Sequence, residues 1–358
     1  MERKYFKEKL TELVAIPTIR EKEMLKESSE ALDLIESWAD SALSKRRIKN
    51  GKTEILLLGN GNLLNPDIGY LAHVDVVDAD KEMFKMTETD GKFYGRGVSD
   101  MKFSIPIGIE ILNKLAKDKG APVMTLAITT DEEVGGGDGG NYLANEIKFI
   151  PEVLIVPDGG DDLVFVNKSK GKATHASTPW LGKNALTPLI KIASGLGAIY
   201  DQNSASPNWE TTMNLGVLQG GKSTNQVCDE ATLKLDFRFP ETRSANEILE
   251  EVRKASEKID PNLSIKLGAQ GDPIYTDIKN LEVTRFLKIA RDVLGRNIKI
   301  EGENGASDAR YWAKYNIPII MKPNGGGIHS DKEWIDVESC LTYYEILSKY
   351  VNEFTSII

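Results

Sequence analysis

Apolar residues recur at intervals of three and four over 5–15 and 22–44, and this spacing predicts two N-terminal helices. Short, largely apolar runs follow at 53–59, 68–77, 125–130 and 153–156, with a helical stretch near 103–117. Strands without polar alternation are buried on both faces, as in a parallel sheet between layers of helices. The first part of the chain therefore predicts an α/β fold with a mostly parallel sheet covered by helices.

After residue 170 the pattern changes. Residues 233–239 alternate between apolar and polar, which is typical of an antiparallel strand with one solvated face. Other expected elements of this part are strands at 213–218 and 263–267 and helices at 184–200 and 244–258. From about 282 the first pattern returns, with helices at 282–294, 307–314 and 337–354 and strands at 297–301 and 317–321. We therefore expect a main domain formed by 1–171 and 278–358, interrupted by an inserted α+β domain at 172–277.

Composition and charge narrow the class of protein. The 358 residues carry a net charge of −9 without a cluster of Lys and Arg, which argues against nucleic acid as a partner. The apolar runs are strand-sized, and the N-terminus has no apolar core of a secretion signal, so we expect neither a membrane span nor export. The two cysteines, Cys228 and Cys340, lie far apart and form no CxxC pattern. We therefore expect no disulfide framework and a cytoplasmic location.

The chain contains only three histidines, His73, His175 and His329, and each lies beside Asp, Ser or Thr in a polar segment. One such histidine taken alone is usually structural, but three of three favour a functional role. His73 ends a predicted strand, and Asp75, two positions further on, shares its face. This arrangement suits a metal-binding imidazole oriented by a carboxylate, and a buried His–Asp pair is the alternative.

Several carboxylates also follow predicted strands. Glu132 and Glu133 belong to a run of three acids after a buried strand, and these acids repel one another unless cations neutralise them. Asp158 follows the next strand, and Asp100 lies in a glycine-bearing turn before a helix. The simpler alternatives are a solvated acidic loop for the glutamates and a helix cap for Asp100.

The carboxyl ends of parallel strands meet at one edge of a sheet, where open α/β folds bind ligands. The acids should therefore converge there, together with His329, which follows the strand at 317–321. Imidazole and carboxylate without thiolate form a ligand set for two zinc ions or a comparable divalent pair. Two such ions could activate a shared water, with one uncommitted glutamate as general base.

These motifs, in this order, resemble the zinc-dependent exopeptidase and deacylase family that includes acetylornithine deacetylase, succinyl-diaminopimelate desuccinylase, carboxypeptidase G and the aminoacylases. The resemblance covers nearly the whole chain and implies the zinc-exopeptidase fold with an inserted lid or dimerisation domain. It also implies that His73 and Asp158 bind one metal, that Glu133 and His329 bind the second, and that Asp100 bridges both.

The resemblance implies further roles around these metals. Glu132 would be the general base of a bridging-water mechanism, and Asp75 would orient His73. In the family the peptide bond after the bridging aspartate is cis. We therefore predict a cis bond between Asp100 and Met101, which is rare for a residue other than proline.

The segment 172–185 resembles the family's lid, in which a histidine reaches into the neighbouring subunit's active site and polarises the scissile carbonyl. His175 would have this role in a homodimer. Asn225 and Arg238 match lid positions that hold the substrate, and an Arg fork suits a free carboxylate. The segment 305–310 resembles another substrate-side loop, and a helix N-cap at Ser307 is the alternative.

Together these features predict a dizinc metallopeptidase or amidohydrolase, in which cobalt or manganese could replace zinc. Its substrate would be a small molecule or dipeptide, cleaved at an amide bond in a peptide or N-acyl amino acid with a free carboxylate. The alternatives are an ester or carbamoyl hydrolase with the same site and a metal-dependent binding protein, for which Glu132 would have no use. A nucleotide-binding protein would need a P-loop or a helix-opening G-x-G-x-x-G, which the sequence lacks.

Overall fold

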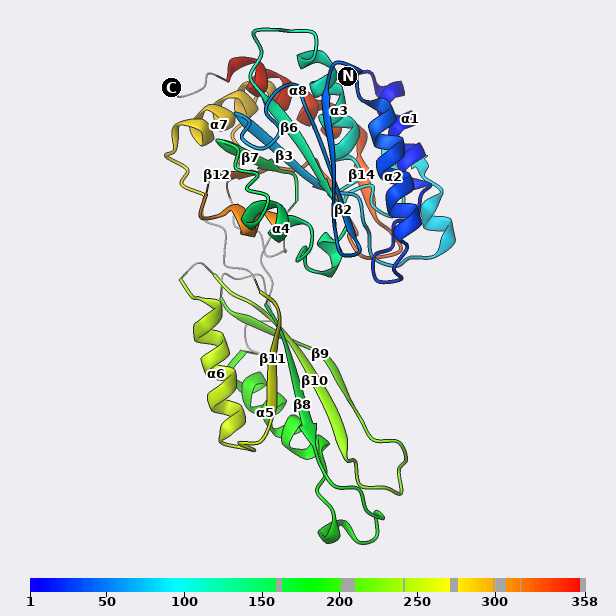
Figure 1. Cartoon of the computed structure of the whole chain (residues 1–358), viewed down its shortest axis with the longest axis vertical. Coiled ribbons are helices and arrows are strands. Elements are labelled where there is room, and N and C mark those ends of the chain that lie inside the picture. Colours follow the sequence, from blue (N-terminus) through cyan, green and yellow to red (C-terminus); the bar gives the residue numbers. More distant parts are fainter. Residues whose placement is uncertain are drawn as a thin grey trace. The chain divides into compact units, whose positions relative to one another are not determined.

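The computed structural model describes residues 1–158, 163–200, 210–240, 242–270, 276–298, 300, 307–315 and 317–354 of the chain. The chain divides into two units, each with its own main sheet (Figure 1). The first unit comprises Met1–Gly159, Tyr275–Glu301 and Ser307–Ile358, and the second comprises Gly160–Ile274 and Gly302–Ala306.

A six-stranded sheet in the order β1-β2-β6-β3-β7-β12 forms the centre of the first unit. Its strands are β1 (Ser44–Asn50), β2 (Thr53–Gly59), β3 (Ile68–His73), β6 (Met124–Thr129), β7 (Val153–Val156) and β12 (Ile317–Ile320). Parallel pairing joins β6, β3, β7 and β12, whereas β2 pairs antiparallel with both β1 and β6. Because β3 lies between β6 and β7, the carboxyl ends of these three strands are neighbours at one edge of the sheet.

Alternate side chains of these strands point to opposite faces of the sheet. On one face, Leu58, Tyr70 and Leu126 share a core with the helices α1 (Arg3–Val14), α2 (Leu25–Trp38), α3 (Ser104–Leu115), α7 (Leu281–Leu294) and α8 (Val337–Glu353). Another layer contains η5 (Asp308–Trp312), which contacts β7 and α4 (Gly140–Asn145). The predicted α/β fold, with a mostly parallel sheet and helices packed on it, is confirmed.

Three elements of the first unit differ from the prediction. The strand expected over 68–77 ends at His73. The helix expected over 22–44 ends at Trp38, and β1 follows it. Because β1 is rich in Lys and Arg, no apolar pattern marked it as a strand; it lies at the edge of the sheet, where charge discourages further pairing. The helix expected over 307–314 is the shorter 3-10 turn η5. The strand expected at 297–301 includes residues 299 and 301, which lie outside the described residues.

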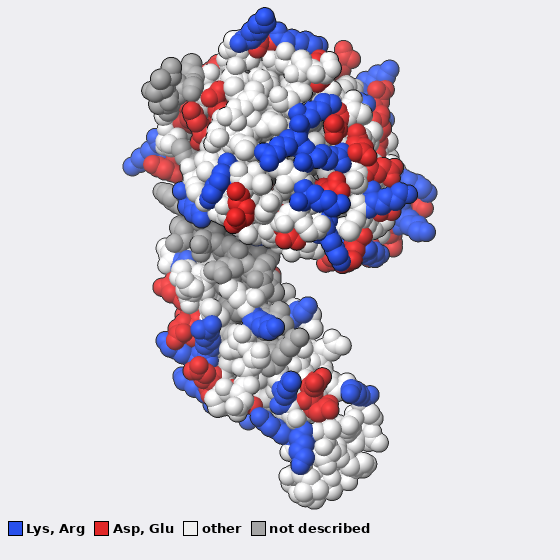
Figure 2. All heavy atoms as spheres, viewed as in Figure 1, with Lys and Arg blue, Asp and Glu red and all other residues white. Residues whose placement is uncertain are grey.

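Opposite charges lie close together on the surface of the first unit. Arg47 of β1 contacts Asp33 at 2.7 Å and Glu54 at 3.2 Å. On the face shown in Figure 2, positive and negative side chains are interspersed over this unit. Among the helices that the structure describes, none combines the length and the apolar character that crossing a bilayer requires.

A small antiparallel sheet joins two distant loops of the first unit. Its order is β13-β14-β5-β4, formed by β4 (Thr87–Thr89), β5 (Lys92–Tyr94), β13 (Gly325–Gly326) and β14 (Trp334–Asp336). Trp334 of β14 pairs with Tyr94 of β5. This pairing places the turn that follows Tyr94 beside the loop that precedes Trp334.

The second unit has an antiparallel sheet in the order β11-β8-β10-β9. Its elements are β8 (Leu163–Lys170), α5 (Leu186–Tyr200), β9 (Thr212–Gly220), β10 (Glu230–Arg238), α6 (Ala245–Glu257) and β11 (Ser264–Gln270). Leu233, Leu235 and Phe237 of β10 are buried in a core with residues of α5 and α6, as the alternating pattern predicted. The unit begins at Gly160 instead of residue 172, because β8 pairs with β10 and β11.

Candidate active site

The five side chains expected to bind metal lie at the carboxyl ends of the parallel strands or on adjoining loops. His73 is the last residue of β3, and Asp158 follows β7 by two positions. Glu133 belongs to η2 (Glu132–Val134), which follows β6. Asp100 and His329 lie on the two loops that the small sheet brings together. The fold of the first unit thus gathers residues from 73 to 329 at one place.

These five side chains, together with Glu132, form two groups that could each hold a cation. His73, Glu132 and Asp158 form one group, and the ligand atoms of these residues lie within 4.8 Å of one another. Asp100, Glu133 and His329 form the other group at the same limit. The groups therefore contain imidazole and carboxylate, which zinc accepts together.

The Asp100 carboxylate lies between the two histidines. Its Oδ1 is 3.2 Å from Nε2 of His73, and its Oδ2 is 3.2 Å from Nε2 of His329. The same Nε2 of His329 is 3.2 Å from Oε2 of Glu133. Since one imidazole nitrogen carries at most one hydrogen, it cannot donate fully to both carboxylates. A cation among the three atoms would satisfy all of them.

These separations fit zinc geometry. Zinc binds nitrogen and oxygen at about 2.0–2.2 Å, so two donors of one tetrahedral ion lie about 3.3 Å apart. The three distances of 3.2 Å around Asp100 and His329 match that value. One oxygen of Asp100 faces each group, which is the geometry of a bridging carboxylate. The peptide bond between Asp100 and Met101 is cis, as predicted.

Asp75 contacts His73, but the shorter contact involves a different atom from the one expected. Nδ1 of His73 lies 3.0 Å from the backbone carbonyl oxygen of Asp75 and 3.6 Å from its carboxylate. Because a carbonyl oxygen only accepts, Nδ1 carries a hydrogen. Nε2 can therefore donate to Asp100 when the ring is protonated, and the neutral ring would offer its Nε2 lone pair to a cation. The Asp75 carboxylate instead accepts the backbone N–H of Glu133 at 3.0 Å.

The three consecutive acidic residues after β6 contact three different sets of partners. Asp131 turns away from the cluster and accepts the backbone N–H groups of Asp138 and Gly139 at 3.0 Å each. Glu132 belongs to the group of His73, and its Oε2 lies 3.9 Å from Nε2 of that histidine. Glu133 belongs to the group of His329. A short 3-10 turn therefore separates adjacent glutamates into different positions.

Charge explains why cations suit this cluster. Hydrogen bonds with Asp100 and Glu133 raise the pKa of His329 to about 10. Burial raises the pKa of Glu132 well above its usual value, although His73 opposes the shift, and burial also raises the pKa of Glu133. Burial acts in the same direction on Asp100, but hydrogen bonds with His329 and His73 outweigh it and hold the pKa of Asp100 below its usual range. The acids thus compete for few positive charges, and divalent ions would replace bound protons.

The segment before η5 lies next to this cluster. Ser307 and Asp308 line a narrow cavity together with His73, Glu132 and Asp158. The Ser307 side chain accepts the backbone N–H of Ala309 at 3.2 Å, which is the N-cap role weighed as the alternative for this segment. Residues 305 and 306, also part of that motif, lie outside the described residues.

The three remaining candidates, His175, Asn225 and Arg238, belong to the second unit. His175 is exposed, and its Nδ1 lies 2.7 Å from the hydroxyl of Ser177. The backbone carbonyl of Asn225 accepts the N–H of Ala176 at 2.8 Å, so Asn225 and His175 lie on adjacent segments. Arg238 donates from Nε to Asp236 at 2.9 Å.

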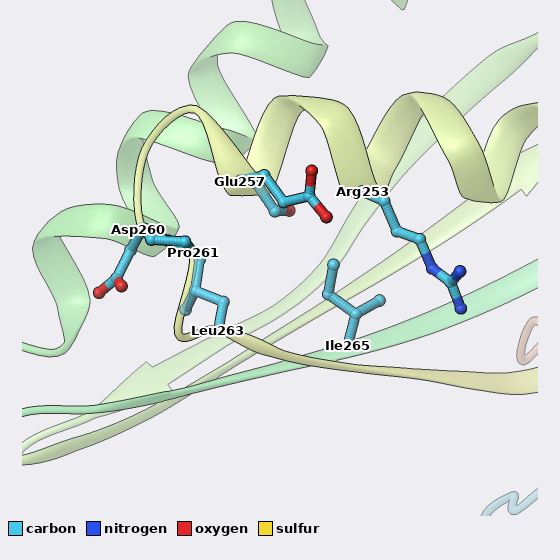
Figure 3. A pocket seen from close by; sticks show the side chains of 7 residues that line it. Arg253, Glu257, Asp260, Pro261, Leu263 and Ile265 are labelled. Atoms are coloured by element: carbon cyan, nitrogen blue, oxygen red, sulfur yellow. The ribbon is translucent and has the colours of Figure 1, made fainter.

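The second unit also has a shallow pocket between α6 and β11 (Figure 3). Its volume is about 250 Å³, and its lining includes Arg253, Glu257 and Asp260. Asp260 is bound to Lys183 at 2.6 Å. Neither of the two cation-binding groups found among the described residues lies in this pocket.

Sequence reasoning missed two charged residues that hold the loop of Asp100. Glu333 is fully buried and accepts hydrogen bonds from that loop. Lys102 is also fully buried, and its Nζ donates to the carbonyl oxygens of Leu13 at 3.1 Å and Ile16 at 2.8 Å. Glu333 follows Asp331 and Lys332, and such a charged run is typical of a solvated loop. No signal in the sequence separated it from that alternative.

Comparison with known proteins gives consistent matches over most of the chain. A model of the peptidase family M20/M25/M40 matches residues 69–353. A probable succinyl-diaminopimelate desuccinylase of Staphylococcus aureus (strain MSSA476) is 24% identical over 351 residues, covering 83% of this chain and 85% of the relative. The acetylornithine deacetylase of Buchnera aphidicola subsp. Acyrthosiphon pisum (strain APS) is 27% identical over 380 residues, covering 96% of each.

Solved structures share the fold of the chain. An M20 family metallo-carboxypeptidase from Sulfolobus solfataricus aligns with a TM-score of 0.78 at 16% identity, covering 96% of this chain and 97% of the other. A tripeptidase from Staphylococcus aureus subsp. aureus Mu50 aligns with a TM-score of 0.76 at 18% identity, covering 98% of both.

Proposed function

Because this chain belongs to peptidase family M20/M25/M40, we propose that it hydrolyses an amide bond in a peptide or N-acyl amino acid with a free carboxylate. The observation that carries this proposal is the position of Asp100, whose two oxygens each lie 3.2 Å from a different histidine. A carboxylate in that position suits two divalent ions side by side. The names of the relatives, a desuccinylase, a deacetylase and peptidases, support an amide substrate.

We assign His73, Asp158 and one oxygen of Asp100 to the first ion. Glu133, His329 and the other oxygen of Asp100 would hold the second. Zinc fits this donor set best, and cobalt or manganese also accepts imidazole with carboxylate. Three protein donors on each ion leave a position open for water or substrate, as in catalytic zinc sites.

Glu132 is left over by this assignment, and we propose that it transfers protons. When bound, the two ions would supply an acidified water and neutralise negative charge on the carbonyl oxygen. Glu132 takes a proton from the attacking water as the oxygen of that water bonds to the carbonyl carbon. It then delivers this proton to the amide nitrogen, which leaves as an amine when the carbon–nitrogen bond breaks. Burial raises the pKa of Glu132 above that of an exposed glutamate, which strengthens it as a proton acceptor.

The second unit would bind the substrate. Arg238 can offer its planar fork to a free carboxylate in exchange for Asp236, which it contacts at 2.9 Å. Asn225 would supply a further polar contact from the exposed segment beside His175. We propose that His175 polarises the scissile carbonyl in the active site of a second copy of the chain.

A homodimer is supported by an exposed apolar surface on the second unit. β9 is an edge strand, and its Leu215, Val217 and Leu218 are exposed. Ile190 and Ile199 of α5, which contacts β9, are also exposed. Edge strands pair readily with a second chain, and two-fold dimers bury the same surface twice. Two buried, free cysteines agree with work in the reducing cytoplasm.

Metal analysis combined with a substrate screen tests this function. The purified protein should bind two zinc, cobalt or manganese ions per chain and should cleave some members of a panel of dipeptides and N-acyl amino acids. Exhaustive chelation should abolish this activity, and added metal should restore it. Full activity after chelation would refute the proposal. Hydrolysis of esters or carbamoyl compounds alone would favour the alternative hydrolase, and metal binding without any turnover would favour a binding protein.

A further inference from the structure

Glu333 is a fully buried carboxylate that the proposed chemistry does not use. Its Oε2 accepts hydrogen bonds from Nη1 of Arg96 at 2.6 Å and from the backbone N–H of Gly97 at 3.0 Å. Its Oε1 accepts the backbone N–H groups of Ser99 at 2.9 Å and Asp100 at 3.1 Å. Both oxygens of one side chain therefore hold a single turn of the chain.

The backbone of that turn is shaped to present its N–H groups. Gly97 adopts a φ of +84°, which favours glycine, and a Cβ there would lie 2.9 Å from Cγ1 of Val76 and 3.0 Å from Cδ of Lys102. In this conformation the N–H groups of Gly97, Ser99 and Asp100 all reach Glu333. Successive N–H groups that converge in this way form a binding site for an anion, and a carboxylate of the same chain fills it here.

Glu333 also links the two segments that carry metal ligands. It lies four positions after His329 and 233 positions after Asp100. Its backbone carbonyl accepts the N–H of Gly95 at 3.2 Å, and the pairing of β5 with β14 continues the contact. The loop of Asp100 therefore cannot shift without moving the segment that holds His329.

A buried ion pair between Arg96 and Glu333 could serve stability alone. Two observations point beyond that role. One Glu333 oxygen binds the N–H of Asp100 itself, whose carboxylate contacts a histidine of each group. Lys102, two residues further along, holds the other side of the same loop through the carbonyls of Leu13 and Ile16. Such anchoring orders the loop during folding, so that metal binding does not have to order it.

We propose that Glu333 is a positioning residue, which fixes the bridging carboxylate of Asp100 before the ions arrive and so sets the affinity for them. This inference rests on the proposed two-metal site. It predicts that Glu333 contributes more to metal affinity than a buried carboxylate of the same unit that lies outside the proposed metal site.

The first test compares Glu333→Gln with Glu282→Gln. Glu282 is a matched control, because it is buried in α7, pairs with Arg285 at 3.2 Å and accepts the hydroxyl of Tyr350 at 3.0 Å. Zinc affinity is measured by competition with a chelator of known affinity, and zinc content by elemental analysis. Loss of a partner that orients a ligand weakens metal binding roughly 10–100-fold, and we expect this for Glu333→Gln alone. Native zinc affinity and content in Glu333→Gln would overturn the inference.

Glu333→Asp covers the case in which the Gln variant does not fold. This variant keeps the charge and withdraws the carboxylate by one methylene, so zinc should bind more weakly to a folded protein. Native affinity in Glu333→Asp would count against the proposed role. If the unmodified chain binds fewer than two ions, the two-metal function itself fails, which is distinguishable from the failure of the Glu333 inference.

Hydrogen exchange of the unmodified, metal-free protein gives a second readout. The amides of Gly97, Ser99 and Asp100 should exchange slowly, because the Glu333 carboxylate accepts them without metal. Exchange at the rate of an unstructured peptide would show that Glu333 does not order the loop before the ions bind, and would overturn the proposal.

Discussion

The two units of the chain hold their candidate residues in opposite ways. In the first unit, contacts of the proposed metal ligands join distant positions, such as His73 with Asp100 and His329 with Glu133. In the second unit, His175 contacts Ser177, Ser223 contacts Asn225, and Arg238 contacts Asp236. Each of these side-chain partners is two residues away along the chain, although a backbone hydrogen bond also joins Ala176 to Asn225.

This difference suggests that the first unit holds its site in a fixed geometry, whereas the second unit can adjust its side chains to a substrate. Contacts between distant segments can form only when the unit is folded, so the proposed metal-binding geometry depends on the fold. Local contacts exist within a few residues and can be exchanged for a substrate without unfolding anything. We therefore expect substitutions in the first unit to affect catalysis or metal binding, and substitutions in the second to affect substrate affinity.

The largest effect is expected from Glu132→Gln. This change removes the proton acceptor but keeps the size of the side chain, so kcat should fall roughly 10²–10⁴-fold with two metals still bound. Steady-state kinetics and elemental analysis on the same sample measure both quantities. Glu146→Gln, an exposed change after α4 in the same unit, is the control and should leave both unchanged. Unchanged turnover in Glu132→Gln would exclude Glu132 as the base.

His175→Ala should reduce kcat roughly 10²-fold or more, because it removes one group that polarises the carbonyl oxygen. If His175 acts in the partner's site, His175→Ala chains mixed with Glu132→Gln chains regain activity. About a quarter of native activity is expected, since half of the two-fold dimers are mixed and each has one competent site. Either variant mixed with itself is the control. A mixture no more active than these controls would place His175 outside the partner's site.

Arg238→Lys should weaken kcat/KM roughly 10–150-fold for substrates with a free carboxylate, since one charge-assisted hydrogen bond is worth about 1.5–3 kcal/mol. The corresponding amidated substrates should show little change. Arg243→Lys changes an arginine that contacts Glu251 in the same unit and should affect neither substrate. An equal loss on free and amidated substrates would contradict carboxylate recognition by Arg238.

The smallest effect is expected from Ser244→Ala at the N-cap of α6. Ser244 accepts the N–H of Glu247, and Glu247 accepts the N–H of Ser244 at 2.7 Å. Loss of this capping box should cost about 0.5–2 kcal/mol of stability in the second unit and leave zinc affinity unchanged. Hydrogen exchange should speed up in α6 but not in α8 of the first unit. Equal changes in both helices would mean that the units unfold together, and would contradict this prediction of an effect confined to the second unit.

Periodicity and composition were sufficient for the α/β fold and for the strands that position the proposed metal ligands. β3, β6 and β7 are buried strands with almost no polar interruption, so their apolar runs were visible without any long-range information. Chain order then placed His73, Glu132, Glu133 and Asp158 after strand ends, and parallel strands bring such residues to one edge. Apolar runs and strand ends can be recognised in the sequence without knowing which segments are in contact.

Tertiary structure alone decided the features whose local sequence permits several outcomes. β1 is too highly charged to show a strand pattern, and β8 joined the second unit only through pairing with β10 and β11. Asp75 orients His73 through its carbonyl oxygen, which every residue possesses and no sequence pattern reveals. The local sequence around Glu333 is typical of a solvated loop. Its carboxylate is buried only because it binds the turn of Asp100, 233 positions away. The hydrophobic pattern of a segment indicates which secondary structure that segment favours by itself. The contacts named here form between distant segments, so their stabilising energy is not visible in any local pattern.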